Sequence, residues 1–176
     1  MNRLINTKFR TIFRVLDMMC INFGDAVSSE RIRIGKQTIY RSVMPEFSLH
    51  LQTQWRFRNG DTVLLGSRDI YTPFSEDVDT EDWDYSLIGR PDCDSSIFDV
   101  VSRQLASELK GHHVISSTMT PYGDILITFS NGYLLEVFIP TSTKEEEWRL
   151  IDCSSGEHFI FHETDDNQET EHSATT

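Results

Sequence analysis

Residues 124–140, with the sequence DILITFSNGYLLEVFIP, constrain the fold more than any other part of the chain. Two runs of apolar, β-branched and aromatic residues are joined by Asn131-Gly132, which tolerates the positive φ that a two-residue turn requires. The stretch therefore predicts an antiparallel hairpin. With a two-residue loop, Phe129 lies opposite Leu134 and Ile127 lies opposite Glu136. Because both faces are largely apolar, we expect this hairpin inside a sheet.

The predicted register places Glu136 on the more apolar face of the hairpin. A buried carboxylate without a partner costs several kcal/mol of folding free energy, so Glu136 needs compensation. We expect it to meet an arginine, to accept backbone N–H groups, or to lie near the sheet edge. The structural role is favoured over that of a functional carboxylate.

The composition indicates a globular protein with a strong negative charge. The chain has 176 residues, of which 38% are hydrophobic and 11% aromatic, and its net charge is −12. Binding to nucleic acid or to an anionic membrane needs clustered Lys and Arg. The sequence therefore predicts neither a nucleic-acid partner nor a membrane partner, and a basic protein is the expected partner.

The cysteines and the opening residues indicate a reducing compartment. Cys20, Cys93 and Cys153 are odd in number and form no CxxC pair, which argues against a disulfide framework and a structural zinc site. The opening residues interleave basic and apolar side chains, unlike a signal peptide. No run approaches the roughly 20 apolar residues of a membrane span. A cytoplasmic location is expected.

The pattern of elements predicts an α+β fold, built from antiparallel β-meanders with one packed helix in each half. Residues 1–71 are predicted as a first helix-plus-meander unit and residues 95–162 as a second. Residues 72–94, rich in Asp and Glu with Pro73 and Pro91, are predicted to connect them. The acidic tail 163–176 lacks apolar periodicity and is expected to be disordered.

Two helices are predicted. Apolar residues recur at spacings of three and four over residues 4–16, which is typical of an amphipathic helix and favours a packed helix over a membrane-surface helix. Residues 18–23 either continue that helix or form a strand, and we favour the strand. A second helix starts after Ser95 or Ser96, with a Ser-x-x-Asp cap, and ends at Gly111. Its buried stripe comprises Phe98, Val101, Leu105 and Leu109.

Further strands follow from alternation between turn signals. They are expected over residues 31–34 and 38–43 around a turn at Gly35-Lys36, 47–57 and 62–65 around Asn59-Gly60-Asp61, 113–119, 148–151 and 157–161. Within residues 47–52, a period of two places His50 on the face opposite the leucines.

A weak repeat suggests an internal duplication. Trp55-Arg56-Phe57 before a turn and a strand resembles Trp148-Arg149-Leu150, and Ile21-Asn22-Phe23 resembles Ile127-Thr128-Phe129. On a strand, the first and third residues of Trp-Arg-apolar share one face. We therefore expect both tryptophans in the core and both arginines outside.

The chain contains no recognised catalytic motif. A P-loop, a dinucleotide-binding glycine fingerprint, a nucleophile elbow and HExxH are all absent from the sequence. His158 and His162 lie four residues apart on one strand, so their side chains are separated by about 13 Å, too far to share an ion. No catalytic residue, metal site or cofactor is predicted.

Six residues are candidates for binding. Trp83 and Tyr85 are aromatic residues among acids, which suits a protein-binding surface, although they also suit anchoring of the acidic segment. Four polar residues are candidates for a pocket between the two units: His50, Arg56, Glu136 and Arg149. Arg149 is also expected to reach Glu136 or its neighbours, unless it is solvated.

Several segments resemble a family of small uncharacterised bacterial proteins over roughly residues 15–152. The matching segments are LHLQ at 49–52, WRF at 55–57, LLGSRDIY at 64–71, GD at 123–124, TFSNG at 128–132, LEVF at 135–138 and WRL at 148–150. Family members carry Cys and Pro where this chain has Thr53 and Gln54. The motifs are structural, so the resemblance implies no catalytic residue. Some members of such families lie near toxin and immunity genes.

Two functions are consistent with these features. The first is a non-enzymatic interaction protein, immunity-like, whose acidic surface masks a basic partner. The alternative is a small-molecule-binding or enzymatic α+β domain with a pocket between the two units.

Overall fold

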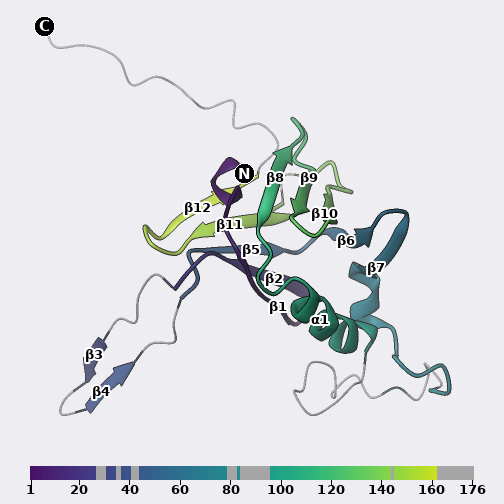
Figure 1. Ribbon diagram of the computed structural model, residues 1–176, viewed down its shortest axis with the longest axis horizontal. Coiled ribbons are helices and arrows are strands. Elements are labelled where there is room, and N and C mark those ends of the chain that lie inside the picture. The colour runs from purple at the N-terminus through teal and green to yellow at the C-terminus, as the bar shows by residue number, and fades with distance from the viewer. Residues whose placement is uncertain are drawn as a thin grey trace, which may run out of the picture.

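The computed structural model describes residues 1–26, 31–34, 37–40, 44–78, 83, 96–143 and 145–161, with only the backbone described at 31–34 and 37–40. Two five-stranded antiparallel sheets form the body (Figure 1), with strand orders β1-β2-β5-β11-β12 and β7-β6-β10-β9-β8. The first sheet contains β1 (Phe9–Val15), β2 (Met18–Phe23), β5 (Phe47–Leu51), β11 (Trp148–Asp152) and β12 (Glu157–Ile160). The second contains β6 (Gln54–Asn59), β7 (Thr62–Gly66), β8 (Val114–Met119), β9 (Ile125–Phe129) and β10 (Tyr133–Phe138).

The inner faces of the two sheets share one hydrophobic core. Phe129 of the second sheet contacts Phe9 and Phe23 of the first, with ring centroids 6.2 and 6.3 Å apart. Phe57 adds a third ring, 6.2 Å from Phe129. Since these side chains come from both sheets, burial of one sheet's apolar face depends on the other sheet.

The chain joins the sheets at two corners. At one corner, β5 of the first sheet leads through residues 52–53 into β6 of the second. At the other, the N–H of Asn6 donates to the carbonyl of Val114 at 2.8 Å, and the N–H of Val114 donates to the carbonyl of Thr7 at 2.9 Å. These backbone bonds connect the start of β1 to the start of β8, so the sheets form a flattened, barrel-like sandwich.

The two halves of the chain contribute strands in the same pattern. Strands β1, β2 and β5 belong to the first sheet, and the following hairpin β6-β7 belongs to the second. Strands β8, β9 and β10 belong to the second sheet, and the following hairpin β11-β12 belongs to the first. Each hairpin therefore completes the sheet begun by the other half.

The prediction of a helix over residues 4–16 is wrong. A short 3-10 helix, η1 (Asn2–Leu4), precedes β1, which pairs antiparallel with β2. A register shift between Phe9 and Thr11 places Phe9 and Ile12 on the core side, three residues apart. This bulge breaks the period of two and imitates helical spacing. The strand favoured for residues 18–23 is confirmed as β2.

The register predicted for the central hairpin is also wrong. Leu135 pairs with Ile127 and Glu136 with Leu126, because residues 130–132 form a three-residue loop between β9 and β10. Gly132 has φ +87°, as the third position of such a loop requires, and Asn131 Oδ1 accepts the N–H of Tyr133 at 3.1 Å. The shift by one residue turns Glu136 from the core face to the outer face.

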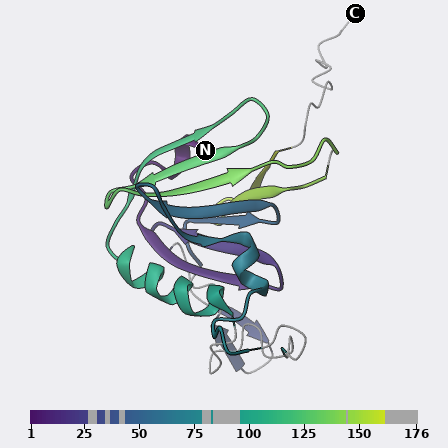
Figure 2. The same cartoon turned by 90° about the vertical axis from the view of Figure 1, so that its right-hand side faces the viewer.

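The helix α1 (Ile97–Glu108) confirms its prediction. Ser96 Oγ accepts the N–H of Asp99 at 3.1 Å, and Phe98, Leu105 and Leu109 are buried. The helix packs against β1, β7 and the 3-10 helix η2 (Ser67–Tyr71), and Figure 2 shows it beside the purple β1-β2 hairpin. Arg14 of β1 forms an ion pair with Asp99 at 3.4 Å. Among the described residues α1 is the only α-helix, so the first half has no packed helix of its own.

The strand predicted over residues 47–57 is two strands, β5 and β6, because the chain passes from the first sheet to the second at residues 52–53. The other strand predictions fit the structure within its described range. A hairpin of β3 (Arg31–Ile34) and β4 (Gln37–Tyr40) projects from the body in Figure 1, and its turn at 35–36 lies outside the described residues. Most of the acidic segment and the tail also lie outside them. The two tryptophans predicted in the core are buried, Trp55 at 2% and Trp148 at 3% exposure.

Candidate functional site

The four polar candidates form two cross-strand pairs on the outer faces of different sheets. Arg56 of β6 lies opposite Glu136 of β10, and His50 of β5 lies opposite Arg149 of β11. Because the sheets pack through their inner faces, the two pairs do not converge. The pocket predicted between the two units from these residues is therefore not formed.

Glu136 meets arginine, which is one of the three environments expected for it from the sequence. Its Oε2 accepts the Nε–H of Arg56 at 2.5 Å, and its Oε1 lies 3.0 Å from Nε of Arg58. Burial alone would raise the pKa of Glu136, but the hydrogen bonds from Arg56 and Arg58 outweigh it and lower that pKa. The carboxylate is thus charged and occupied, in a structural role.

His50 and Arg149 have separate hydrogen-bond partners. Arg149 bonds to Glu146 through both Nε and Nη2, the latter at 2.7 Å, so the expected contact with Glu136 does not form. His50 Nε2 lies 3.0 Å from Ser48 Oγ, which donates to Asn22 Oδ1 at 2.8 Å. Burial, followed by the positive charge of Arg149, lowers the pKa of His50. The charged form of the ring is thus disfavoured on the outer face of the first sheet.

The aromatic candidates of the acidic segment divide between described and undescribed residues. Trp83 is 8% exposed, which leaves little of the indole for a partner. Tyr85 lies outside the described residues.

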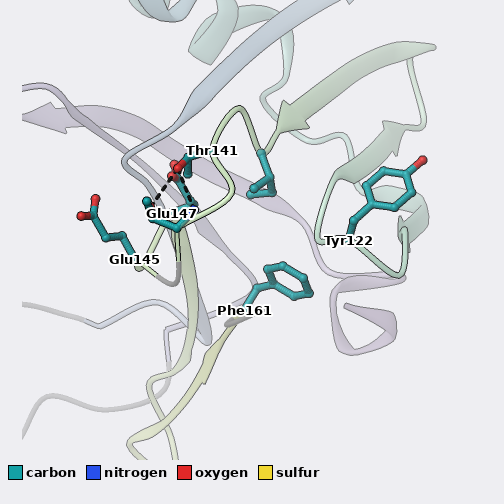
Figure 3. A pocket seen from close by; sticks show the side chains of 7 residues that line it. Tyr122, Thr141, Glu145, Glu147 and Phe161 are labelled. Carbon is teal, nitrogen blue, oxygen red and sulfur yellow. Dashed lines mark hydrogen bonds between the residues drawn. The ribbon is translucent and has the colours of Figure 1, made fainter. Parts of the chain in front are cut away.

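A pocket that the sequence did not indicate lies at one end of the first sheet. We call it the acidic pocket, and Figure 3 shows Phe161 between Tyr122 and Glu145. Its walls come from the β8–β9 turn, the connection from β10 to β11, and the residue after β12. The lining residues are Tyr122, Ile139, Thr141, Thr143, Glu145, Glu147 and Phe161.

Close packing around Gly123 holds the acidic pocket in shape. Trp148 Nε1 donates to the Gly123 carbonyl at 2.9 Å, and Phe161 stacks on Trp148 with ring centroids 6.1 Å apart. Gly123 has φ +92°, and a Cβ there would lie 2.3 Å from Cδ1 of Phe161. Only glycine fits this position. The buried indole and the backbone thus fix the Phe161 ring.

The lining of the acidic pocket favours a cation. Among the described residues, its lining contains two carboxylates, Glu145 and Glu147, two aromatic rings and no Lys or Arg. Thr141 and Thr143 are hydrogen-bonded to each other, with their hydroxyl oxygens 2.8 Å apart. A positively charged group can meet the carboxylates and an aromatic face together. The run Glu145-Glu146-Glu147 before Trp148 was the available sequence signal, but the aromatic residues come from distant segments.

Neither metal chemistry nor a membrane span is supported by the described part of the chain. Among those residues, no group of three or more His, Cys, Asp or Glu side chains is placed to hold a metal ion. None of the helices described there is long and apolar enough to cross a bilayer.

Comparison of the chain with models of known protein families, with curated proteins and with solved structures finds no match.

Proposed function

We propose that this protein is a non-enzymatic interaction module whose acidic pocket receives a Lys or Arg side chain of a basic partner protein. The observation that carries the proposal is the presence of Glu145 and Glu147 beside the rings of Tyr122 and Phe161 in one pocket. Tyr122 is 61% exposed, so its ring is available for contact.

The acidic pocket selects for a Lys or Arg side chain, and the net negative charge of the protein attracts the basic partner. An exposed cation–π contact contributes about 0.5–1 kcal/mol, and an exposed ion pair about 0.2–1 kcal/mol. One side chain in the pocket therefore binds weakly by itself. The net charge of −12 accelerates encounter with a basic protein and makes binding sensitive to salt.

The resemblance to bacterial proteins found near toxin and immunity genes supports an immunity-like role. A basic toxin is a partner of the required charge, and masking it requires a surface and no catalytic group. A cytoplasmic location is part of the same proposal.

We also propose that the fold arose by internal duplication. The matching order of strands supports it, since β6 with Trp55 and β11 with Trp148 occupy corresponding places in the two sheets. The same holds for β2 with Ile21 and β9 with Ile127. The opening segments also correspond: α1 packs against β1 and β7, while η1 packs against β8 and Arg3 bonds to Glu157 of β12.

Titration with short peptides tests the interaction. Peptides with one central Arg, Lys or norleucine are added to the isotope-labelled full chain while backbone and aromatic NMR signals are recorded. We expect the Arg and Lys peptides to shift the signals of Tyr122 and Phe161, and the norleucine peptide to leave them in place. Binding should weaken as salt is raised.

A charge-matched control separates the effect of the pocket carboxylates from that of the protein's overall negative charge. The double variant Glu145→Gln with Glu147→Gln should abolish these shifts. The control Glu76→Gln with Asp77→Asn removes the same charge from residues that do not line the pocket and should largely keep them. Equal loss in both variants, or shifts with norleucine, would contradict recognition by the acidic pocket.

A further inference from the structure

The edges of the two sheets are covered unequally on the two sides of the molecule. On one side, the helix α1 packs against the edge strands β1 and β7. On the other side the edge strands are β8 and β12, and the 3-10 helix η1 lies between them (Figure 1). It packs against β8, and the guanidinium of Arg3 lies 4.4 Å from the centre of the Phe159 ring of β12. One side is thus covered by a helix of 12 residues and the other by one of 3.

The side that η1 covers carries exposed apolar side chains. Ile115 and Met119 of β8 are 52% and 47% exposed, and Ile5, which follows η1, is also exposed. Ile5 and Ile115 lie close together, because the N–H of Asn6 donates to the carbonyl of Val114. Met119 lies four residues further along β8, about 13 Å from Ile115. These side chains therefore follow the length of the strand.

The acidic pocket lies at the end of the same side. Residues of and next to η1 bond to the first residues of β8 and β12, which are Val114 and Glu157. Tyr122 and Phe161 of the acidic pocket come after the last residues of these two strands. Both strands therefore run from η1 to the acidic pocket.

We call this side of the molecule the β8 surface and define it by four exposed residues: Ile5, Ile115, Met119 and Tyr122. The six residues of β8 span about 20 Å. The 12 residues of α1 span about 18 Å. A helix like α1 thus has the length that the β8 surface requires.

A helix suits this surface better than an added strand. Ser117, in the middle of β8, is 1% exposed, so the backbone edge that a new strand would pair with is already covered. The side chains of Ile115 and Met119 stay exposed on either side of it. A helix contacts such side chains through an apolar stripe and needs no backbone hydrogen bonds from its partner.

The charges near the β8 surface favour a basic helix. The strand β8 contains no charged residue, and Glu145 and Glu147 lie at one end of the surface. At the other end, Arg3 is already bonded to Asp152 and Glu157. Because the net charge of the chain is −12, a helix with Lys or Arg on its polar face is attracted to this side.

We propose that the basic partner presents an amphipathic helix of about 12–14 residues to the β8 surface. The apolar stripe of that helix covers Ile115 and Met119, and a Lys or Arg near its end enters the acidic pocket. This inference rests on the proposed function, because it specifies the form of the same partner. It adds an apolar contact, which the carboxylates of the acidic pocket do not provide.

Two model peptides of about 14 residues and identical Ala, Leu and Lys composition test the proposal. In the first, the leucines form one helical stripe, and in the second they are distributed around the helix. Each peptide is added to the methyl-labelled full chain while NMR signals are recorded. The striped peptide should shift the methyl signals of Ile115 and Met119 and the ring signals of Tyr122. The scrambled peptide should shift only those of Tyr122 and bind about tenfold more weakly.

Variants separate this inference from the proposed function. The double variant Ile115→Thr with Met119→Thr should weaken binding of the striped peptide about tenfold and keep the response of Tyr122 to a short Arg peptide. The control Val63→Thr alters an exposed apolar residue of β7, away from the β8 surface, and should change neither.

Three outcomes would overturn the helix proposal: equal binding of both peptides, unshifted methyl signals of Ile115 and Met119, or equal weakening by Val63→Thr. Each of these leaves the acidic pocket as a site for a Lys or Arg side chain. Loss of the short-peptide response in the wild type would instead contradict the proposed function itself.

Discussion

Strands β6 and β11 occupy corresponding places in the two sheets, yet the pockets beside them have opposite charge. Next to β11, the connection over residues 139–147 carries Glu145 and Glu147 into the acidic pocket. Next to β6, the link is only residues 52–53, and a second pocket there is lined by two arginines, Arg56 and Arg68, and one carboxylate, Asp69. The comparison teaches that the shared strand order sets where a pocket forms, whereas the connections set its chemistry.

The largest expected effect concerns the packing beneath the acidic pocket. Gly123→Ala should lower the free energy of unfolding by about 3 kcal/mol, because a Cβ at positive φ is strained and would collide with Phe161. Gly132→Ala is the control: its φ is +87° and nothing lies within 4 Å of the added Cβ, so about 1 kcal/mol is expected. Urea unfolding measures both, and equal values would show that Phe161 yields freely.

The two tryptophans provide the next comparison. Trp148→Phe should destabilise the protein by about 1 kcal/mol more than Trp55→Phe, because only the former leaves a bonded carbonyl, that of Gly123, without its donor. Both variants lose similar apolar area, so the difference isolates the hydrogen bond. Thermal and urea unfolding of the ligand-free chains give the two values. An equal or larger loss for Trp55→Phe would mean that its N–H is satisfied.

A smaller difference is expected between the outer ion pairs. Glu136→Gln should lower the free energy of unfolding by about 1 kcal/mol, because Arg56 and Arg58 both lose their partner. Glu146→Gln should lower it by about 0.5 kcal/mol, because only Arg149 loses its partner. The pKa of Glu136 is held below 4.5, so its contribution is present above pH 4.5 and is lost as pH falls through the folded-state pKa. Unfolding curves across acidic pH should show this loss in the wild type and not in Glu136→Gln.

The smallest expected effect concerns His50, which corresponds to Glu136 in the other sheet. His50 precedes Leu51, which pairs with Trp148, and Glu136 precedes Val137, which pairs with Trp55. The pKa of His50 is held below 6.5 by burial and Arg149, so its contribution to stability is present above pH 6.5 and is lost as pH falls through the folded-state pKa. His50→Gln should remove this component from the pH dependence of unfolding. An unchanged pH profile would show that His50 titrates normally.

Local patterns in the sequence predicted much of the fold. The cap at Ser96, the buried face of α1 and the placement of both tryptophans are confirmed, because each depends on side chains close together in the chain. The bulge near Thr11 and the three-residue loop before Tyr133 were missed. Each shifts a strand by one residue. The bulge was hidden by an apparent helical spacing, and the three-residue loop by the two-residue turn that Asn131-Gly132 indicates.

The candidate sites were harder to predict than the strands. Arg56 was selected from the sequence and does line a pocket, and Glu136 did find its arginines. Tyr122 and Phe161 had no distinguishing pattern in the sequence. Their pocket brings together segments that are separated in the chain by strands β9 to β12.

The sequence by itself determined most of the strands, the capped helix, the burial of both tryptophans and the strong negative charge, because these follow from periodicity and composition over short windows. Tertiary structure decided which hairpin completes which sheet, and hence which connection faces each tryptophan. That choice depends on the two sheets burying one another's apolar faces. It left one indole N–H bonded to Gly123 and the other without an acceptor among the residues that the structure describes.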